Sequence, residues 1–242
     1  MANTMSPKQL GELANPEFCP RCFWLHHRMK FKAPYDMFPG IFSTLDKYQK
    51  NMVTEHIKAY GKVPEWLNVF GEFVGVEPSP HWSKFSIDLP NGWKFRGATD
   101  TLLRKTDGSL FILDEKTAMP KGDGHRLELM YDVQLNGYAK IANEVGLGPV
   151  SGLGIVYNTP QQFGEDITVE KMASSDHYVM EFRPVTRVVP IDMVNVDRLL
   201  DTAISLVENE TCPGGFEGCS NCIKIDELVA LAGVSLVGEA RV

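Results

Sequence analysis

Long apolar runs are missing from this sequence, and so is any internal repeat or low-complexity tract. No segment approaches the roughly 18 apolar residues that a membrane-spanning helix needs, so we expect no membrane partner. The N-terminus has no basic region followed by an apolar core. We therefore expect no secretory signal and a cytoplasmic location.

The chain also has no excess of positive charge: acidic residues outnumber basic ones, and the formal net charge is −7. This balance argues against non-specific coating of nucleic acid. It leaves room for local binding of nucleic acid, because a basic groove can hold a strand while carboxylates hold a metal. One basic cluster near the N-terminus is either such a surface or the solvated face of a helix. Its members are Arg21, His26, His27, Arg28, Lys30 and Lys32.

Helical and extended patterns alternate along the chain. Ser6 followed by Pro7 predicts a helix start, with Ser6 as the N-cap. Further helices are expected at 19–29, 43–60, 126–145 and 191–208, with a short one in the C-terminal tail. Strands are expected at 66–76, 82–89, 93–104, 110–116, 149–157 and 178–188. Polar or Pro/Gly-rich loops are expected at 34–40, 119–124 and 159–175.

These elements predict an α/β fold with a mixed sheet, in which a three-strand meander is followed by a helix and a further strand. No composition shift marks a linker. We expect a single domain over 1–242, with a core at about 40–190. The Cys-bearing helical parts, 1–39 and 191–242, are expected to pack together and to flank the core.

The most informative residues lie at the ends of two predicted strands. Asp100 follows one apolar, β-rich stretch, and the run 110–113 leads into Asp114, Glu115 and Lys116. Two adjacent antiparallel strands would place these charges at neighbouring ends. Side chains alternate along a strand, so Asp114 and Lys116 share a face. Glu115 points to the other face, although its backbone carbonyl could reach the same metal.

Two carboxylates beside a lysine suit the hydrolysis of a phosphodiester. Carboxylates hold Mg²⁺ or Mn²⁺, which prefer oxygen ligands. The metal lowers the pKa of bound water, and a lysine can orient that water or neutralise the developing oxyanion. The alternative is an exposed hairpin with a surface salt bridge. The apolar run before Asp114 favours the metal-site interpretation. Charged side chains at the end of a buried strand cost free energy, and a functional role would account for them.

The order of these motifs resembles the PD-(D/E)XK nuclease superfamily, and within it the RecB-like nucleases and CRISPR-adaptation exonucleases. The matching residues are Gly97, Asp100, Asp114, Glu115, Lys116, Thr117, Gln134 and Tyr138. The resemblance implies a restriction-endonuclease-like core in which the two aspartates bind metal and the lysine is catalytic. The glutamine and the tyrosine, four residues apart on one helix face, would contact the substrate or order the site.

The activity implied by the resemblance is that of a Mg²⁺- or Mn²⁺-dependent deoxyribonuclease, an exonuclease acting on single-stranded or end-bearing DNA. Recombination, repair or CRISPR-adaptation proteins would be its partners. Members often carry a histidine upstream, but Thr44 stands at that position here. Asp46, Glu55 or His56 could replace it, all on the same predicted helix. The departure also leaves open a catalytically inactive DNA-binding or assembly module on the same fold.

The five cysteines lie only near the two ends of the chain: Cys19, Cys22, Cys212, Cys219 and Cys222. Two Cys-x-x-Cys pairs suit a tetrahedral metal, which would clamp the chain ends together. The resemblance implies a [4Fe–4S] cluster held by one N-terminal and three C-terminal thiolates. That set is Cys19, Cys212, Cys219 and Cys222, with Cys22 as a spare or substitute.

Two alternatives to the cluster remain at this stage. Zn²⁺ would use the two Cys-x-x-Cys pairs, and the chain would then also fit a zinc-stapled interaction protein whose acidic hairpin is incidental. Otherwise some of the thiols are simply buried small apolar residues. The tryptophans 24, 66, 82 and 93 could stack bases, although core packing is the commoner role and the one expected for Trp93.

Overall fold

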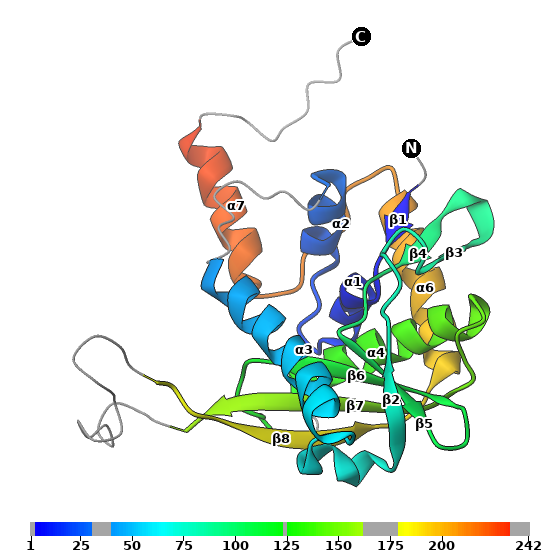
Figure 1. Cartoon of the computed structure of the whole chain (residues 1–242). Helices are drawn as coiled ribbons and strands as arrows, with labels where there is room; N and C mark the ends of the chain where they lie inside the picture. Colours follow the sequence, from blue (N-terminus) through cyan, green and yellow to red (C-terminus); the bar gives the residue numbers. More distant parts are fainter. Residues whose placement is uncertain (1–2, 31–39, 123–124, 162–178, 233–242) are drawn as a thin grey trace.

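The computed structural model describes residues 3–30, 40–122, 125–161 and 179–232. A five-stranded sheet with the strand order β2-β5-β6-β7-β8 forms its centre (Figure 1). The pair β6–β7 is parallel and the other three pairs are antiparallel. These strands are β2 (Phe73–Glu77), β5 (Thr101–Lys105), β6 (Leu110–Lys116), β7 (Val150–Pro160) and β8 (Phe182–Val189).

A second, three-stranded sheet has the order β1-β4-β3. Its strands are β1 (Thr4–Met5), β3 (Ser86–Asp88) and β4 (Lys94–Arg96). The N-terminal strand pairs with a strand from the middle of the chain, and this pairing brings the start of the protein beside the segment that leads to Asp100.

Helices cover both faces of the large sheet, with α3 and α4 on opposite sides of β6 (Figure 1). The α-helices are α1 (Pro7–Gly11), α2 (Pro20–Arg28), α3 (Gly40–Tyr60), α4 (Arg126–Glu144), α6 (Met193–Glu208) and α7 (Ser220–Leu231). The 3₁₀ helices are η1 (Glu12–Ala14), η2 (Glu65–Phe70) and η3 (Pro90–Gly92). No helix in the described ranges is long and apolar enough to cross a bilayer.

The central strand β6 is buried along almost its whole length, because its two faces pack into two different apolar clusters. Leu110 and Ile112 belong to the cluster that contains the buried face of α4. Phe111 and Leu113 belong to the cluster formed with α3 and η2. A strand covered on both sides reads as a continuous apolar run, which is why 110–113 stands out in the sequence.

The α/β fold with a meander, a helix and a further strand is confirmed, and it is consistent with a restriction-endonuclease-like core. The helix start at Ser6 is also confirmed, since Ser6 and Gln9 form a reciprocal capping box. The predicted loops at 34–40 and 159–175 lie largely outside the described residues.

Three strand predictions differ from the structure. Residues 66–70 belong to the 3₁₀ helix η2 rather than to a strand. This helix ends at Gly71, whose φ is 113°, and the extended segment begins only at Phe73. The expected strand 93–104 is divided into β4 and β5, which belong to different sheets. The expected strand 82–89 is extended only over Ser86–Asp88.

The N-terminal and C-terminal helical parts meet beside the sheet. Helix α1 packs on α4 and α6, and α2 packs on α6 and α7 (Figure 1). This contact sets the two Cys-x-x-Cys pairs at the beginnings of α2 and α7 next to each other, although nearly the whole chain separates them.

Candidate functional site

The acidic residues converge where β5 begins and β6 ends. Asp100 immediately precedes β5, and its Oδ2 accepts a hydrogen bond from the backbone N–H of Glu115 at 3.0 Å. The β5–β6 register pairs Thr101 with Leu113, so the two strands present Asp100 and Asp114 at the same edge of the sheet. The convergence of the two strand ends is thus a consequence of antiparallel pairing.

Asp114 and Lys116 form the buried centre of this site. The Nζ of Lys116 lies 2.7 Å from Asp114 Oδ2 and 4.5 Å from the centre of the Tyr131 ring. The amide of Gln134 lies 3.3 Å from Asp114 Oδ1 and donates to the Tyr138 hydroxyl at 3.1 Å. Helix α4 therefore fixes both the carboxylate and the ammonium from one face, at helical spacing.

The close approach of helix α4 explains why position 97 is a glycine. A Cβ at Gly97 would lie 2.7 Å from a ring carbon of Tyr138 and 3.2 Å from Pro7. No side chain fits there, so the Gly-x-x-Asp motif lets the chain pass directly over the tyrosine that supports Gln134. The glycine serves close packing next to the site.

Helix α3 contributes a residue that the sequence analysis missed. The Nζ of Lys50 lies 2.9 Å from Asp100 Oδ1 and 2.7 Å from Asp46 Oδ2. Gln49, on the same turn, exchanges hydrogen bonds with the hydroxyl of Thr117 at 2.9 and 3.1 Å. The i, i+4 spacing of Asp46 and Lys50 indicates an ion pair between them. No local sequence pattern indicates that Lys50 also contacts Asp100.

Asp46, Glu55 and His56, the candidates for the upstream ligand, lie at different distances from the acidic site. Asp46 contacts Lys50, which in turn pairs with Asp100. Glu55 pairs with Lys58 at 2.7 Å on the exposed side of α3. The Nδ1 of His56 lies 2.9 Å from the carbonyl oxygen of Lys62. The structure brings neither Glu55 nor His56 to the aspartates.

Glu115 lies on the opposite face of β6, as the strand alternation predicts. It is 7% exposed, and its Oε1 accepts a hydrogen bond from the Thr101 hydroxyl at 3.1 Å. Its backbone N–H is bound to Asp100, so side chain and backbone both belong to the acidic group.

Burial makes this group electrostatically unfavourable when fully ionised. Burial raises the pKa of Asp114 to about 7; Lys116 opposes this shift and Asp100 adds to it. Burial likewise raises the pKa of Glu115 to about 7 against the Thr101 hydrogen bond. Burial lowers the pKa of Lys116, but Asp114 outweighs it and the net shift is upward. Burial and nearby Asp114 also raise the pKa of Tyr138.

The donor set fits a divalent cation. Asp114 is 2% exposed, and its Oδ2 touches Lys116 yet has no well-directed hydrogen bond. An oxygen so buried is short of one partner. A Mg²⁺ or Mn²⁺ ion would supply that partner and offset the repulsion among three carboxylates. Asp100 and Asp114 would hold it through their carboxylates, and Glu115, whose side chain lies on the other face of β6, through its backbone carbonyl.

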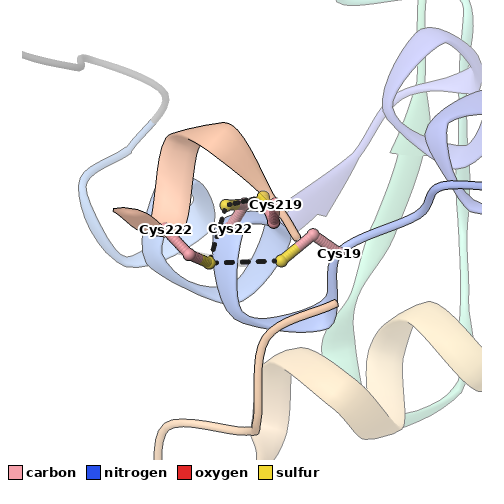
Figure 2. A group of neighbouring side chains, drawn as sticks. All are labelled: Cys19, Cys22, Cys219 and Cys222. Carbon is pink, nitrogen blue, oxygen red and sulfur yellow. Dashed lines mark hydrogen bonds between the residues drawn. The ribbon is translucent and has the colours of Figure 1, made fainter. Parts of the chain in front are cut away.

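A second group of potential ligands lies at the ends of the chain. Cys19, Cys22, Cys219 and Cys222 place their sulfur atoms within 4.8 Å of one another (Figure 2). Cys212 is exposed and stays outside this group. The set expected from the resemblance contained Cys212, whereas the set that the structure brings together contains Cys22.

Two members of the basic N-terminal cluster hold the chain ends together. Arg21 binds Asp226 of α7 through two hydrogen bonds, at 3.0 and 2.5 Å. Arg28 lies over the ring of Trp24 and donates to the carbonyl of Asn209 at 2.9 Å. Lys32 lies outside the described residues. These contacts tie α2 to the C-terminal part of the chain.

Comparison with known proteins agrees with this geometry. The family model described as the PD-(D/E)XK nuclease superfamily matches residues 43–223, most of the chain. This chain belongs to the PD-(D/E)XK nuclease superfamily. No curated protein matches this nuclease. One solved structure, titled "Crystal structure of SSO0001", is 17% identical, with a TM-score of 0.44 over 87% of this chain and 79% of that one.

The matched range has a bearing on both sites of this PD-(D/E)XK nuclease. It contains the whole carboxylate–lysine group from Lys50 to Tyr138, and it contains Cys219 and Cys222. Cys19 and Cys22 precede it. The cysteine group therefore joins a segment inside the nuclease region to one outside it.

Proposed function

We propose that this nuclease hydrolyses phosphodiester bonds of DNA with Mg²⁺ or Mn²⁺ bound at Asp100, Asp114 and Glu115. The observation that supports it most strongly is the convergence of the buried Asp114 and the partly buried Asp100 with Lys116 at one edge of the sheet. A salt bridge on a surface hairpin would not bury Asp114 to 2% exposure. A buried ion pair is a costly arrangement, and it is expected where function requires it.

When bound, the metal supplies a Lewis acid and lowers the pKa of a coordinated water. Asp114 is held for this role because Gln134 fixes one carboxylate oxygen and Lys116 the other. Lys116 keeps its proton, since Asp114 raises its pKa. Its ammonium is thereby set to orient the attacking water or to neutralise charge that develops on the phosphate. Tyr138 positions Gln134 through its hydroxyl.

A preference for DNA ends and single strands rests on the resemblance, and an exposed aromatic residue supports it. Trp82 is 48% exposed and lies 4.8 Å from the guanidinium carbon of Arg96. The loop that carries Trp82 is joined to the acidic segment, because Thr99 donates to Ser79 at 3.2 Å. Unpaired bases stack on such platforms, whereas paired bases cannot reach them. Trp93, by contrast, is 1% exposed and belongs to the core, as expected.

The resemblance further implies exonuclease action within recombination, repair or CRISPR adaptation, and a [4Fe–4S] cluster or Zn²⁺ at the cysteines. We propose that the cysteine metal is structural. It lies between α2 and α7, at the junction of the chain ends, and contacts none of the acidic residues described above.

The test is cleavage of end-labelled single-stranded and double-stranded DNA by pure protein with Mn²⁺, beside covalently closed circular DNA. We expect cleavage of the linear substrates, faster on single strands, and no product without a divalent cation. Lys116→Ala and Asp114→Ala should reduce the rate by at least 10²-fold, the usual scale for loss of a charge-stabilising group.

Lys58→Ala is the matched control. Lys58 lies on α3 with 65% of its side chain exposed, and its replacement removes a positive charge without touching the site. Full activity in Lys116→Ala would refute the assignment of the site. No cleavage by the parent, with DNA still bound and Lys116→Ala binding equally well, would instead favour a non-catalytic DNA-binding module.

A further inference from the structure

We infer that Cys19, Cys22, Cys219 and Cys222 bind one Zn²⁺ ion as a closed tetrathiolate site, and that Cys212 is not a ligand. This inference departs from the [4Fe–4S] cluster that the family resemblance implies. It is independent of the proposed nuclease activity, because it concerns the junction of the chain ends and not the carboxylates.

The sulfur spacing separates the two metals. Sγ of Cys222 lies 3.5 Å from that of Cys19 and 3.5 Å from that of Cys22, and the sulfurs of Cys22 and Cys219 are 3.6 Å apart (Figure 2). A zinc ion with Zn–S bonds of about 2.3 Å in a tetrahedron places neighbouring sulfurs roughly 3.8 Å apart. In a [4Fe–4S] cluster each thiolate binds a different iron, so the sulfurs stand roughly 6 Å apart. All four sulfurs here lie within 4.8 Å, a space that fits one ion and not a cluster.

Both cysteine pairs lie at the start of a helix. Cys19 is the N-cap of α2 and Cys222 lies in the first turn of α7, while Cys219 is the N-cap of α7. The N-terminal ends of two helices, where backbone N–H groups lack partners within the helix, therefore lie beside the sulfurs. The backbone N–H of Phe216 donates to the Sγ of Cys19 at 3.3 Å. Such N–H donors orient the ligands of a metal site.

Other contacts keep the two helices in this register. Arg21, between the first two cysteines, binds Asp226 of α7 bidentately. A Cβ at Gly215 would lie 3.0 Å from the Sγ of Cys222, so a residue without a side chain lets the preceding segment pass close to the sulfurs. Cys212 is exposed, and its Sγ lies 3.7 Å from the carbonyl oxygen of Pro213, away from the four sulfurs.

The ligand set decides what the metal does. Four protein thiolates leave no open position for water or substrate, as in structural zinc sites. Cys22 and Cys219 are 197 residues apart, so the ion closes almost the whole chain into a loop. Its binding energy therefore contributes to folding, and the site has neither redox chemistry nor the oxygen sensitivity of an iron–sulfur cluster.

The test is elemental analysis of the full chain, purified without air from cells supplied with both iron and zinc. We expect about one zinc per chain, with iron and acid-labile sulfide near zero. Replacement by Co²⁺ should give the intense visible absorption of a tetrahedral thiolate site. Iron and sulfide at about four each per chain would overturn the inference, as would a single iron without sulfide, or a parent protein that takes up no zinc.

Two variants separate the ligand sets. Cys22→Ser should lose the zinc, whereas Cys212→Ser, the matched control, should keep it. The cluster set containing Cys212 requires the reverse. Should Cys22→Ser fail to fold, the thiol reactivity of the native parent gives the same decision. Cys212 alone should react rapidly with a thiol reagent, and rapid reaction of Cys22 together with protection of Cys212 would refute the proposed ligand set.

Discussion

Glu115 is the buried carboxylate of the proposed active site that has no ion pair anywhere in the described part of the chain. Its strongest direct contact is the hydroxyl of Thr101, a hydrogen bond that a glutamine would also accept. Glu115→Gln therefore removes one negative charge with little change in shape. We expect this variant to make the metal-free protein more stable and the metal-bound protein less active.

The magnitude follows from the pKa of Glu115, which burial raises from 4.5 to about 7. The folded state then binds the proton more tightly than the unfolded state does. Stability contributed by the protonated form is complete below pH 4.5 and is lost as the pH rises to about 7. At about 1.4 kcal/mol per pH unit, ionised Glu115 destabilises the metal-free fold by about 3 kcal/mol above pH 7. This cost is what Glu115→Gln removes.

The assay is denaturant unfolding of parent and variant at pH 5 and pH 8, with and without Mn²⁺ and without a chelator, so that the cysteine site stays intact. Without Mn²⁺ we expect the variant to be more stable at pH 8 by up to about 3 kcal/mol, and the difference to shrink towards pH 5. With Mn²⁺ at about 100 times its dissociation constant, the parent should gain about 2.7 kcal/mol and the variant less.

Glu65→Gln is the control, since Glu65 is exposed at the start of η2 and its replacement makes the same chemical change. It should shift stability by less than about 0.5 kcal/mol at either pH. An equal or lower stability of Glu115→Gln at pH 8 without metal would refute the reasoning. So would a difference that does not change between pH 5 and pH 8.

Three further perturbations test other parts of the structure. Gly97→Ala should cost roughly 1–3 kcal/mol of unfolding free energy, measured in denaturant, because its Cβ would lie 2.7 Å from the Tyr138 ring; a neutral effect would contradict the packing. Lys50→Met should tighten Mn²⁺ binding by ~1 kcal/mol, roughly fivefold in a metal titration, since the ammonium no longer neutralises Asp100; weaker binding would show that Lys50 supports the metal site. Burial, against the charge of Lys8, raises the pKa of Glu12 to about 7, so Glu12→Gln should stabilise the fold above pH 7 and lose this advantage towards pH 4.5. Thermal unfolding across pH would exclude that account if the difference were constant.

Features that depend on local chemistry were readable from the sequence. The helix start at Ser6 and Pro7, the buried run that ends at Asp114, and the helical spacing of Gln134 and Tyr138 each involve neighbours along the chain. The family motif follows the same rule, because it is a series of short patterns in a fixed order. The strand boundaries were predicted less accurately. The break between β4 and β5, for example, arises because the two segments join different sheets.

The sequence by itself determined the fold class, the meander that carries Asp100 and Asp114, and the presence of two Cys-x-x-Cys pairs. Periodicity and motif spacing encode these, since they arise from backbone geometry over a few residues. Only the tertiary structure decided that Lys50 binds Asp100, that Gly97 makes room for Tyr138, and that Cys22 rather than Cys212 joins the sulfur group. Each of these contacts joins segments far apart in the chain, so burial and packing select the partner, and no local pattern records that choice.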